Sequence, residues 1–97
     1  MNPTLEEIKE KARPVFEKYG VKRARIFGSF ARGEARSDSD VDMVVDLERP
    51  LGFEYFTMQH ELEQELGREV DIMTEGSINK FFRPYIIPEL RPLYDRR

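Results

Sequence analysis

The sequence predicts an α/β fold, in which helices pack on a small β-sheet. Three segments repeat apolar residues at the spacing of an amphipathic helix, and three short segments rich in β-branched residues alternate with them. The chain has 97 residues, of which 39% are hydrophobic and 11% aromatic. This length and composition are typical of one folded domain, which we expect to span residues 1–97.

The first predicted helix begins at a capping box, in which the side chains of Thr4 and Glu7 each reach the other residue's backbone N–H. Pro14 falls inside the helical pattern and is expected to kink the helix, and Gly20 is expected to end it. The apolar residues at helical spacing are Leu5, Ile8, Ala12, Val15, Phe16 and Tyr19.

Residues 21–27 form the first predicted strand, with Ala24 and Ile26 on one face and Arg23 and Arg25 on the other. A short helix is expected directly after it.

Two further strands are predicted at 41–45 and 68–73, and a helix over 53–66 that ends at Gly67 lies between them. The apolar stripe of this helix consists of Tyr55, Met58, Leu62 and Leu66.

A last amphipathic helix is predicted in the C-terminal tail, where Pro84 and Pro88 also interrupt the chain. The residues at helical spacing there are Ile78, Phe81, Phe82, Tyr85 and Ile86. Two interpretations stay open for the apolar residues of the tail: they complete the core, or some of them form a surface for a partner. These residues are Phe81, Phe82, Tyr85, Ile86, Ile87, Leu90, Leu93 and Tyr94.

The composition bounds the class of protein. A net charge of −3 and a pI of about 5.2 do not favour direct binding of nucleic acid. The chain has no cysteine, which excludes disulfides and thiolate metal sites and fits a cytoplasmic protein. No run of about 20 apolar residues suggests a membrane span.

Gly28 and Ser29 follow the first predicted strand. Backbone N–H groups are free at such a strand-to-helix turn and can hold phosphate, and glycine lets the backbone approach a ligand closely. Ser29 is expected at the N-cap position, where its hydroxyl adds a polar group. The pair alone is weak evidence, because Gly-Ser is common in turns.

Asp40 and Asp42 form a stronger signal, because alternation along a strand points both carboxylates to one face. Their repulsion is relieved by a cation or a shared proton, and carboxylate oxygens suit Mg²⁺ or Mn²⁺. The alternative is a solvated strand end in an acidic protein. Asp38 is expected in the turn before the strand, and Asp46 past the strand's end.

Asp71 interrupts an apolar run in the third predicted strand. If that strand pairs beside the second one, Asp71 faces the same site as Asp40 and Asp42. Three carboxylates on adjacent strands can hold two metal ions about 3.5–4 Å apart, which activate an attacking hydroxyl and stabilise a leaving pyrophosphate.

The compound pattern resembles the signature of the DNA polymerase beta-like nucleotidyltransferase superfamily. It consists of Gly28-Ser29, ten intervening residues, Asp40-Val41-Asp42 and a later Asp71. The flanking FGSFARGEARSDSDVDMVV is similar to the minimal nucleotidyltransferases (MNT proteins) of archaea and bacteria. The resemblance implies a small mixed β-sheet with helices packed on it, two Mg²⁺ ions, and nucleotidyl transfer from a nucleoside triphosphate.

The same resemblance implies roles for the motif residues. Asp40 and Asp42 bind both metals, Asp71 helps to bind one and activates the acceptor hydroxyl, and Gly28 with Ser29 holds the triphosphate. Arg32 lies within one turn of Ser29, where it either contacts the triphosphate or is an ordinary solvated arginine. His60 is expected to be solvated, and Glu75 and Ser77 to be loop and helix-cap residues.

MNT proteins are typically encoded beside HEPN proteins, so the resemblance implies an antitoxin that transfers AMP from ATP to a tyrosine of a HEPN ribonuclease toxin. Two other readings stay open. In one, the chain neutralises a toxin by binding alone, which leaves three converging carboxylates without a purpose. In the other, it modifies a small molecule such as an antibiotic; this reading is disfavoured because we expect a single domain over residues 1–97, without a second, pocket-forming domain.

Overall fold

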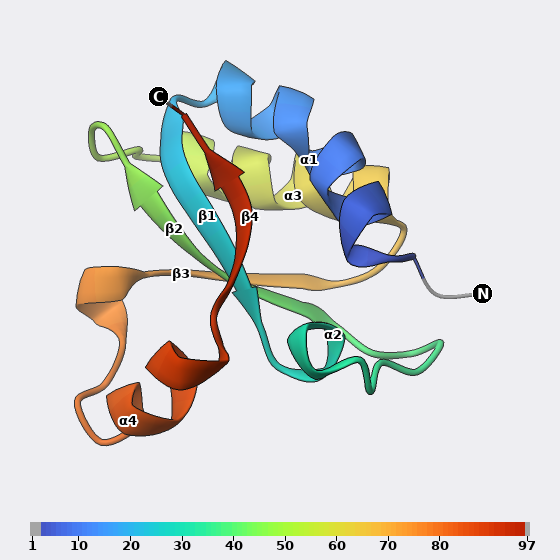
Figure 1. Ribbon diagram of the computed structural model, residues 1–97. Coiled ribbons are helices and arrows are strands. Elements are labelled where there is room, and N and C mark those ends of the chain that lie inside the picture. Colours follow the sequence, from blue (N-terminus) through green and yellow to red (C-terminus); the bar gives the residue numbers. More distant parts are fainter. Residues whose placement is uncertain (1–2, 97) are drawn as a thin grey trace.

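The computed structural model describes residues 3–96, which form a four-stranded sheet in the order β3-β2-β1-β4. Helices α1 and α3 lie together over one face of this sheet, whereas α2 and α4 lie at its lower end in Figure 1. Strands β1 and β2 are antiparallel, and β2 and β3 are parallel. The predicted α/β fold with a small mixed sheet is therefore confirmed.

Helix α1 spans Leu5–Lys18 and begins as predicted. The Glu7 N–H donates to the Thr4 hydroxyl at 3.1 Å, and the Thr4 N–H donates to the Glu7 carboxylate at 3.0 Å. The helix continues through Pro14, so the expected kink there stays a prediction. It ends just before Gly20, whose φ of 69° is the left-handed conformation that glycine tolerates.

All three predicted strands are present. Strand β1 (Val21–Phe27) has the predicted bounds, and β2 (Val41–Leu47) is two residues longer than expected. Strand β3 (Val70–Thr74) begins two residues later and ends one residue later than the predicted 68–73. Asp46 is therefore inside β2, and the expectation that it lies past the strand end is wrong. The reason is its cross-strand partner, because Asp46 pairs with Arg23 of β1 in the ladder and its carboxylate accepts a 2.8 Å hydrogen bond from Arg23 Nε.

Alternation along β2 gives the sheet two different faces. Val41, Met43 and Val45 are fully buried in the main core, which they form with residues of α1 and α3. Asp42, Val44 and Asp46 point to the opposite face, which we call the open face. The polar candidates of β2 therefore lie on the side of the sheet that α1 and α3 leave uncovered.

Helix α3 spans Glu54–Leu66 and buries Met58, Leu62 and Leu66 as predicted. Its neighbouring stripe, made of Tyr55, Gln59 and Glu63, covers the outer edge of β3 with side-chain hydrogen bonds. Tyr55 Oη donates to Ile72 O at 2.8 Å, and Gln59 Nε2 donates to Val70 O at 2.9 Å. The Val70 N–H donates to Glu63 at 3.2 Å. These bonds occupy backbone groups to which another strand could otherwise pair.

The prediction of a last amphipathic helix is wrong. The tail instead consists of η1 (Glu75–Ser77), α4 (Arg83–Ile86), η2 (Ile87–Glu89) and β4 (Arg91–Asp95). Prolines stand in the first turn of both α4 and η2, where their rings and missing N–H groups prevent one continuous helix. Strand β4 was not predicted; it pairs with β1 at the sheet edge, where Pro92 is tolerated.

The tail also settles which of its apolar residues join the core. Leu93 is buried and Tyr94 packs against the core through a ring contact with Phe16. Three aromatic residues are exposed instead: Phe81 by 72%, Phe82 by 59% and Tyr85 by 74%. We call these three residues the aromatic surface. The interpretation that the whole tail completes the core is wrong for them.

Candidate active site

The parallel pairing of β2 and β3 places Asp71 directly beside Asp42. Both residues have the parity of the open face, so their carboxylates share one side of the sheet. Asp40 lies one residue before β2 and is exposed. The condition under which Asp71 was expected to join the site, the pairing of the third strand beside the second, is thus met.

The electrostatics of Asp42 reflect this crowding. Burial raises the pKa of Asp42 from its ordinary value of 3.8 to about 6, with further contributions from the charge of Asp71, a hydrogen bond with Asp71 and the charge of Asp40. The positive charge of Arg32 acts in the opposite direction. Four sequence-predicted site residues therefore lie within electrostatic reach of one another.

These carboxylates do not form a preassembled metal cage. Within residues 3–96, no three His, Cys, Asp or Glu side chains are arranged so that they could hold a metal ion. What the structure brings together is the pair Asp42 and Asp71, with Asp40 exposed nearby. Oxygen donors of this kind fit Mg²⁺, which retains several waters and takes only one or two carboxylates directly.

Gly28 lies directly against Asp42, one member of this carboxylate pair. Its φ of 81° and ψ of −153° are accessible essentially only to glycine, and a Cβ built there would lie 2.7 Å from Asp42 Oδ2. The turn after β1 and the carboxylate of β2 are therefore packed together, with no space for a side chain between them.

Ser29 is the first residue of α2 (Ser29–Arg32), and the N-cap position belongs to Gly28. The expectation that Ser29 is the N-cap is therefore wrong by one residue, because the left-handed glycine is what turns the chain out of β1. Ser29 is partly buried, and its carbonyl accepts a 2.8 Å hydrogen bond from the Glu34 N–H.

Arg32 is neither simply solvated nor isolated. Its Nε donates to Glu34 at 2.6 Å, and its Nη1 lies 3.1 Å from both carboxylate oxygens of Glu89 in η2. The hydrogen bond with Glu34, followed by that with Glu89, raises the pKa of Arg32. His60 is exposed on α3, as expected of a solvated residue.

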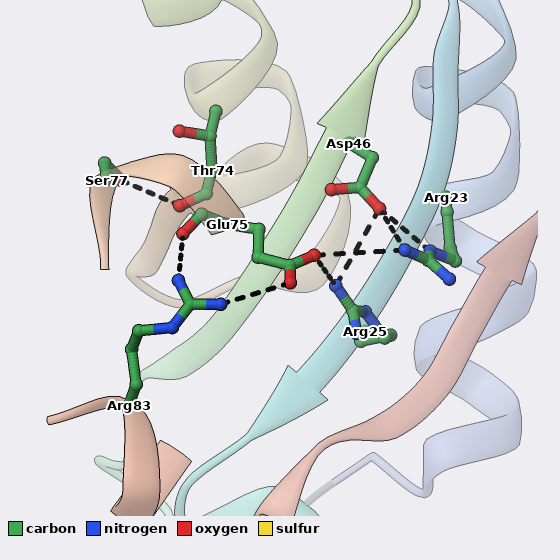
Figure 2. Close-up of polar contacts among 7 residues, drawn as sticks. All are labelled: Arg23, Arg25, Asp46, Thr74, Glu75, Ser77 and Arg83. Carbon is green, nitrogen blue, oxygen red and sulfur yellow. Dashed lines mark hydrogen bonds and ion pairs between the residues drawn. The ribbon is translucent and has the colours of Figure 1, made fainter. Parts of the chain in front are cut away.

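Sequence analysis missed the charged cluster that Glu75 organises on the open face. Figure 2 shows the Glu75 carboxylate between arginines of β1 and of α4. Glu75 Oε2 lies 3.0 Å from Arg25 and 3.9 Å from Arg23, and Oε1 lies 3.4 Å from Arg83. Arg83 also donates to the Glu75 carbonyl at 3.1 Å. The one local signal was the alternation of Arg23 and Arg25, which marks a polar face but not its partner.

Comparisons with known proteins bear on this site. The sequence pattern of the family described as "Nucleotidyltransferase domain" matches residues 5–94. A Methanocaldococcus jannaschii protein, named as a candidate protein adenylyltransferase, is 42% identical over 86 residues, which are 88% of this chain and 92% of that protein. The protein adenylyltransferase MntA of Thermococcus cleftensis is 35% identical over 92 residues, covering 90% of this chain and 93% of that protein.

Solved structures share the fold. One described as a candidate minimal nucleotidyltransferase is 35% identical, with a TM-score of 0.77 over 94% of this chain and 97% of that one. A toxin–antitoxin crystal structure with AMP-PNP has a TM-score of 0.77 at 17% identity, over 92% of this chain and 74% of that one. A tri-AMPylated Shewanella oneidensis HEPN toxin in complex with its MNT antitoxin gives a TM-score of 0.72 at 14% identity, over 96% and 74%.

Proposed function

The chain belongs to the nucleotidyltransferase domain family, and we propose that it is a Mg²⁺-dependent protein adenylyltransferase. In this proposal it transfers AMP from ATP to a tyrosine of a HEPN ribonuclease toxin, and so acts as the antitoxin in the cytoplasm. The supporting observation is the register of β2 and β3, which sets Asp71 beside Asp42 with Gly28 packed against Asp42. The adenylyltransferase names of the relatives support the reaction class.

The proposed metal ligands are Asp40, Asp42 and Asp71. They fit Mg²⁺ because their donors are carboxylate oxygens. The pKa of Asp42 is raised mainly by burial and then by the negative charges of Asp71 and Asp40, which a cation would offset. Two bound Mg²⁺ ions would stabilise the charge that develops on the attacking and leaving oxygens of an in-line displacement. Gly28, Ser29 and Arg32 are the proposed triphosphate contacts, supplied by the turn after β1 and by α2.

The chain's own residues account for the remaining steps. The tyrosine oxygen forms a bond to the α-phosphorus of ATP, and the bond from that phosphorus to the bridging oxygen breaks, so that pyrophosphate leaves. The hydroxyl proton passes to Asp71, which is exposed and can release it to water. Arg32 carries a positive charge near the site and favours the negative triphosphate there.

The aromatic surface is the proposed contact for the toxin. Phe81, Phe82 and Tyr85 are exposed, and surfaces of this kind often bind another protein. They precede η2, whose Glu89 reaches Arg32 beside the carboxylates. A protein bound on this surface would therefore lie near the carboxylate site. No helix within residues 3–96 is both long and apolar enough for a membrane span.

The test is transfer to a purified HEPN protein encoded beside this chain. After incubation with the chain, ATP and Mg²⁺, the intact mass of the HEPN protein should rise by one or more AMP units. The double variant Asp40→Asn/Asp42→Asn should leave that mass unchanged while still binding the HEPN protein in a pull-down, because the aromatic surface is untouched.

The same double variant separates catalysis from binding in cells that co-express the toxin. We expect it to bind the toxin and yet fail to protect growth, because it lacks the ligands of the in-line transfer. If it protects as well as the wild type, the chain neutralises its toxin by contact alone and the transferase proposal is wrong as the mechanism of neutralisation.

A further inference from the structure

Arg32 has two carboxylate partners that differ in where they come from. Glu34 is two residues away, directly after the C-cap of α2, whereas Glu89 is 57 residues away, in η2. Both oxygens of Glu89 lie 3.1 Å from the same Arg32 nitrogen, Nη1. Of these two contacts, only the one with Glu89 ties the tail to the helix that follows the Gly28 turn.

The contact between Glu89 and Arg32 occupies a side chain that the proposed function assigns to the binding of ATP. We infer that Glu89 and the triphosphate compete for Arg32, so that ATP binding releases η2 from α2; this inference rests on the proposed function. Arg32 contacts Glu89 through Nη1 and Glu34 through Nε. A bidentate contact with phosphate uses Nη2 together with either Nε or Nη1. A triphosphate that binds Arg32 in this way must therefore replace at least one carboxylate.

Contact distance and backbone tethering favour the replacement of Glu89, because its contact with Arg32 is 3.1 Å long, against 2.6 Å for that of Glu34. The Arg32 side chain is 47% exposed and that of Glu89 34%, and ion pairs of this exposure are weak. A triphosphate carries more charge than one carboxylate and can contact Arg32 through two oxygens. Glu34 is held nearby because its N–H donates to Ser29 O at 2.8 Å. The charges of both carboxylates would repel a triphosphate, but Glu89 has no such tether to α2.

The release has a consequence for the tail. Residues 83–89 are anchored at two places, by Arg83 on Glu75 and by Glu89 on Arg32. When the second anchor opens, η2 and the approach to β4 lose a restraint, directly after the aromatic surface. Because coupling between two binding events is reciprocal, a protein that draws η2 away from α2 tightens the binding of ATP.

The experiment compares the wild type with Glu89→Gln and with a charge-matched control, Asp95→Asn, which removes a carboxylate from β4. Calorimetry measures the Kd of Mg·ATP, and hydrogen exchange measures the amides of Ile86, Ile87 and Leu90. We expect Glu89→Gln to bind Mg·ATP about 2- to 5-fold more tightly, the range expected from losing one exposed ion pair. Asp95→Asn should bind it as the wild type does.

Hydrogen exchange reports the release itself. Exchange at these amides should become faster in the wild type when Mg·ATP is added, and should already be fast in Glu89→Gln without it. An unchanged or weaker affinity in Glu89→Gln, or slower exchange of the wild type with Mg·ATP, would overturn the competition while leaving the proposed function intact. A wild type whose Mg·ATP signal is no larger than that of Asp42→Asn would overturn both.

Discussion

The two faces of the sheet are made by alternating residues of the same strands, but the two faces have different roles. On the covered face, Val41, Met43 and Val45 of β2 are fully buried beneath α1 and α3. On the open face, Asp42 and Asp46 are only partly buried, and Asp42 has a pKa raised to about 6. The covered face therefore supplies stability. At Asp42 and Asp71, by contrast, the open face holds like charges together at some expense of stability, and this arrangement suits a site for a cation.

The largest expected effect comes from breaking the covered face. Phe16→Ala removes a fully buried ring and should lower the free energy of unfolding by about 3–5 kcal/mol. The same change on the aromatic surface, Phe82→Ala, should alter it by less than about 0.5 kcal/mol, because Phe82 is 59% exposed. Urea denaturation of both variants measures this difference. Equal losses would mean that the tail packs into the core after all.

Because Phe82→Ala is expected to leave the stability unchanged, it can test whether the aromatic surface binds the HEPN protein. It should weaken the pull-down of the HEPN protein while leaving stability unchanged. Wild-type binding by this variant would exclude Phe82 from the interface.

A smaller effect is expected where the open face meets the turn after β1. Gly28→Ala should lower the free energy of unfolding by about 1–3 kcal/mol, because it combines backbone strain with a Cβ 2.7 Å from Asp42 Oδ2. The control Gly33→Ala has a similar φ of 73° but no atom within 4 Å of the new Cβ, so its loss should be about 1 kcal/mol. Calorimetric titration with Mg·ATP should show weaker binding for Gly28→Ala than for Gly33→Ala. Equal affinities would place the triphosphate elsewhere.

The next change is expected to have the opposite sign. Asp42→Asn should raise the free energy of unfolding by about 1 kcal/mol at pH 7, less than the pKa shift alone implies, because solvent screens this partly buried carboxyl. Melting curves should show Tm higher by about 4–8 °C without ligand. The gain in Tm that Mg·ATP gives the wild type should be lost. Asp38→Asn, in an exposed turn, serves as the control and should keep that gain.

The smallest expected effect is a pH dependence. The folded pKa of Asp42 is raised above its ordinary value, so between about pH 4 and 6 the folded state binds more protons than the unfolded state. The contribution of Asp42 to stability is thus lost as pH rises through about 6. Denaturation at pH 4.5 and 7.5 should show that the wild type loses more stability than Asp42→Asn over this interval. A difference of the opposite sign would contradict the raised pKa.

The reasons for the correct and wrong predictions are physical. The Thr4 capping box, the stripe of α3 and the alternation of β2 are local patterns, and all three were predicted from residues a few positions apart. The tail has a helical pattern too, from Ile78 to Ile86, but Pro84 and Pro88 interrupt it. Its aromatic residues are exposed, so the helical spacing of apolar residues does not by itself show that those residues are buried in a core.

The sequence by itself determined the order of the elements up to Thr74, the motif at Gly28, Asp40, Asp42 and Asp71, and the resemblance to nucleotidyltransferases. These features depend on the spacing of residues that are close in the sequence, and that spacing does not depend on the tertiary structure.

Only the tertiary structure decided the partners of the charged side chains. Glu75 meets Arg25 across 50 residues and Glu89 meets Arg32 across 57. Which distant charges meet depends on the order of strands and on the path of the tail over the open face. Neither the strand order nor the path of the tail can be predicted from the residues that flank these charged side chains in the sequence. An exposed arginine has the same local sequence whether it contacts a carboxylate, a phosphate or water.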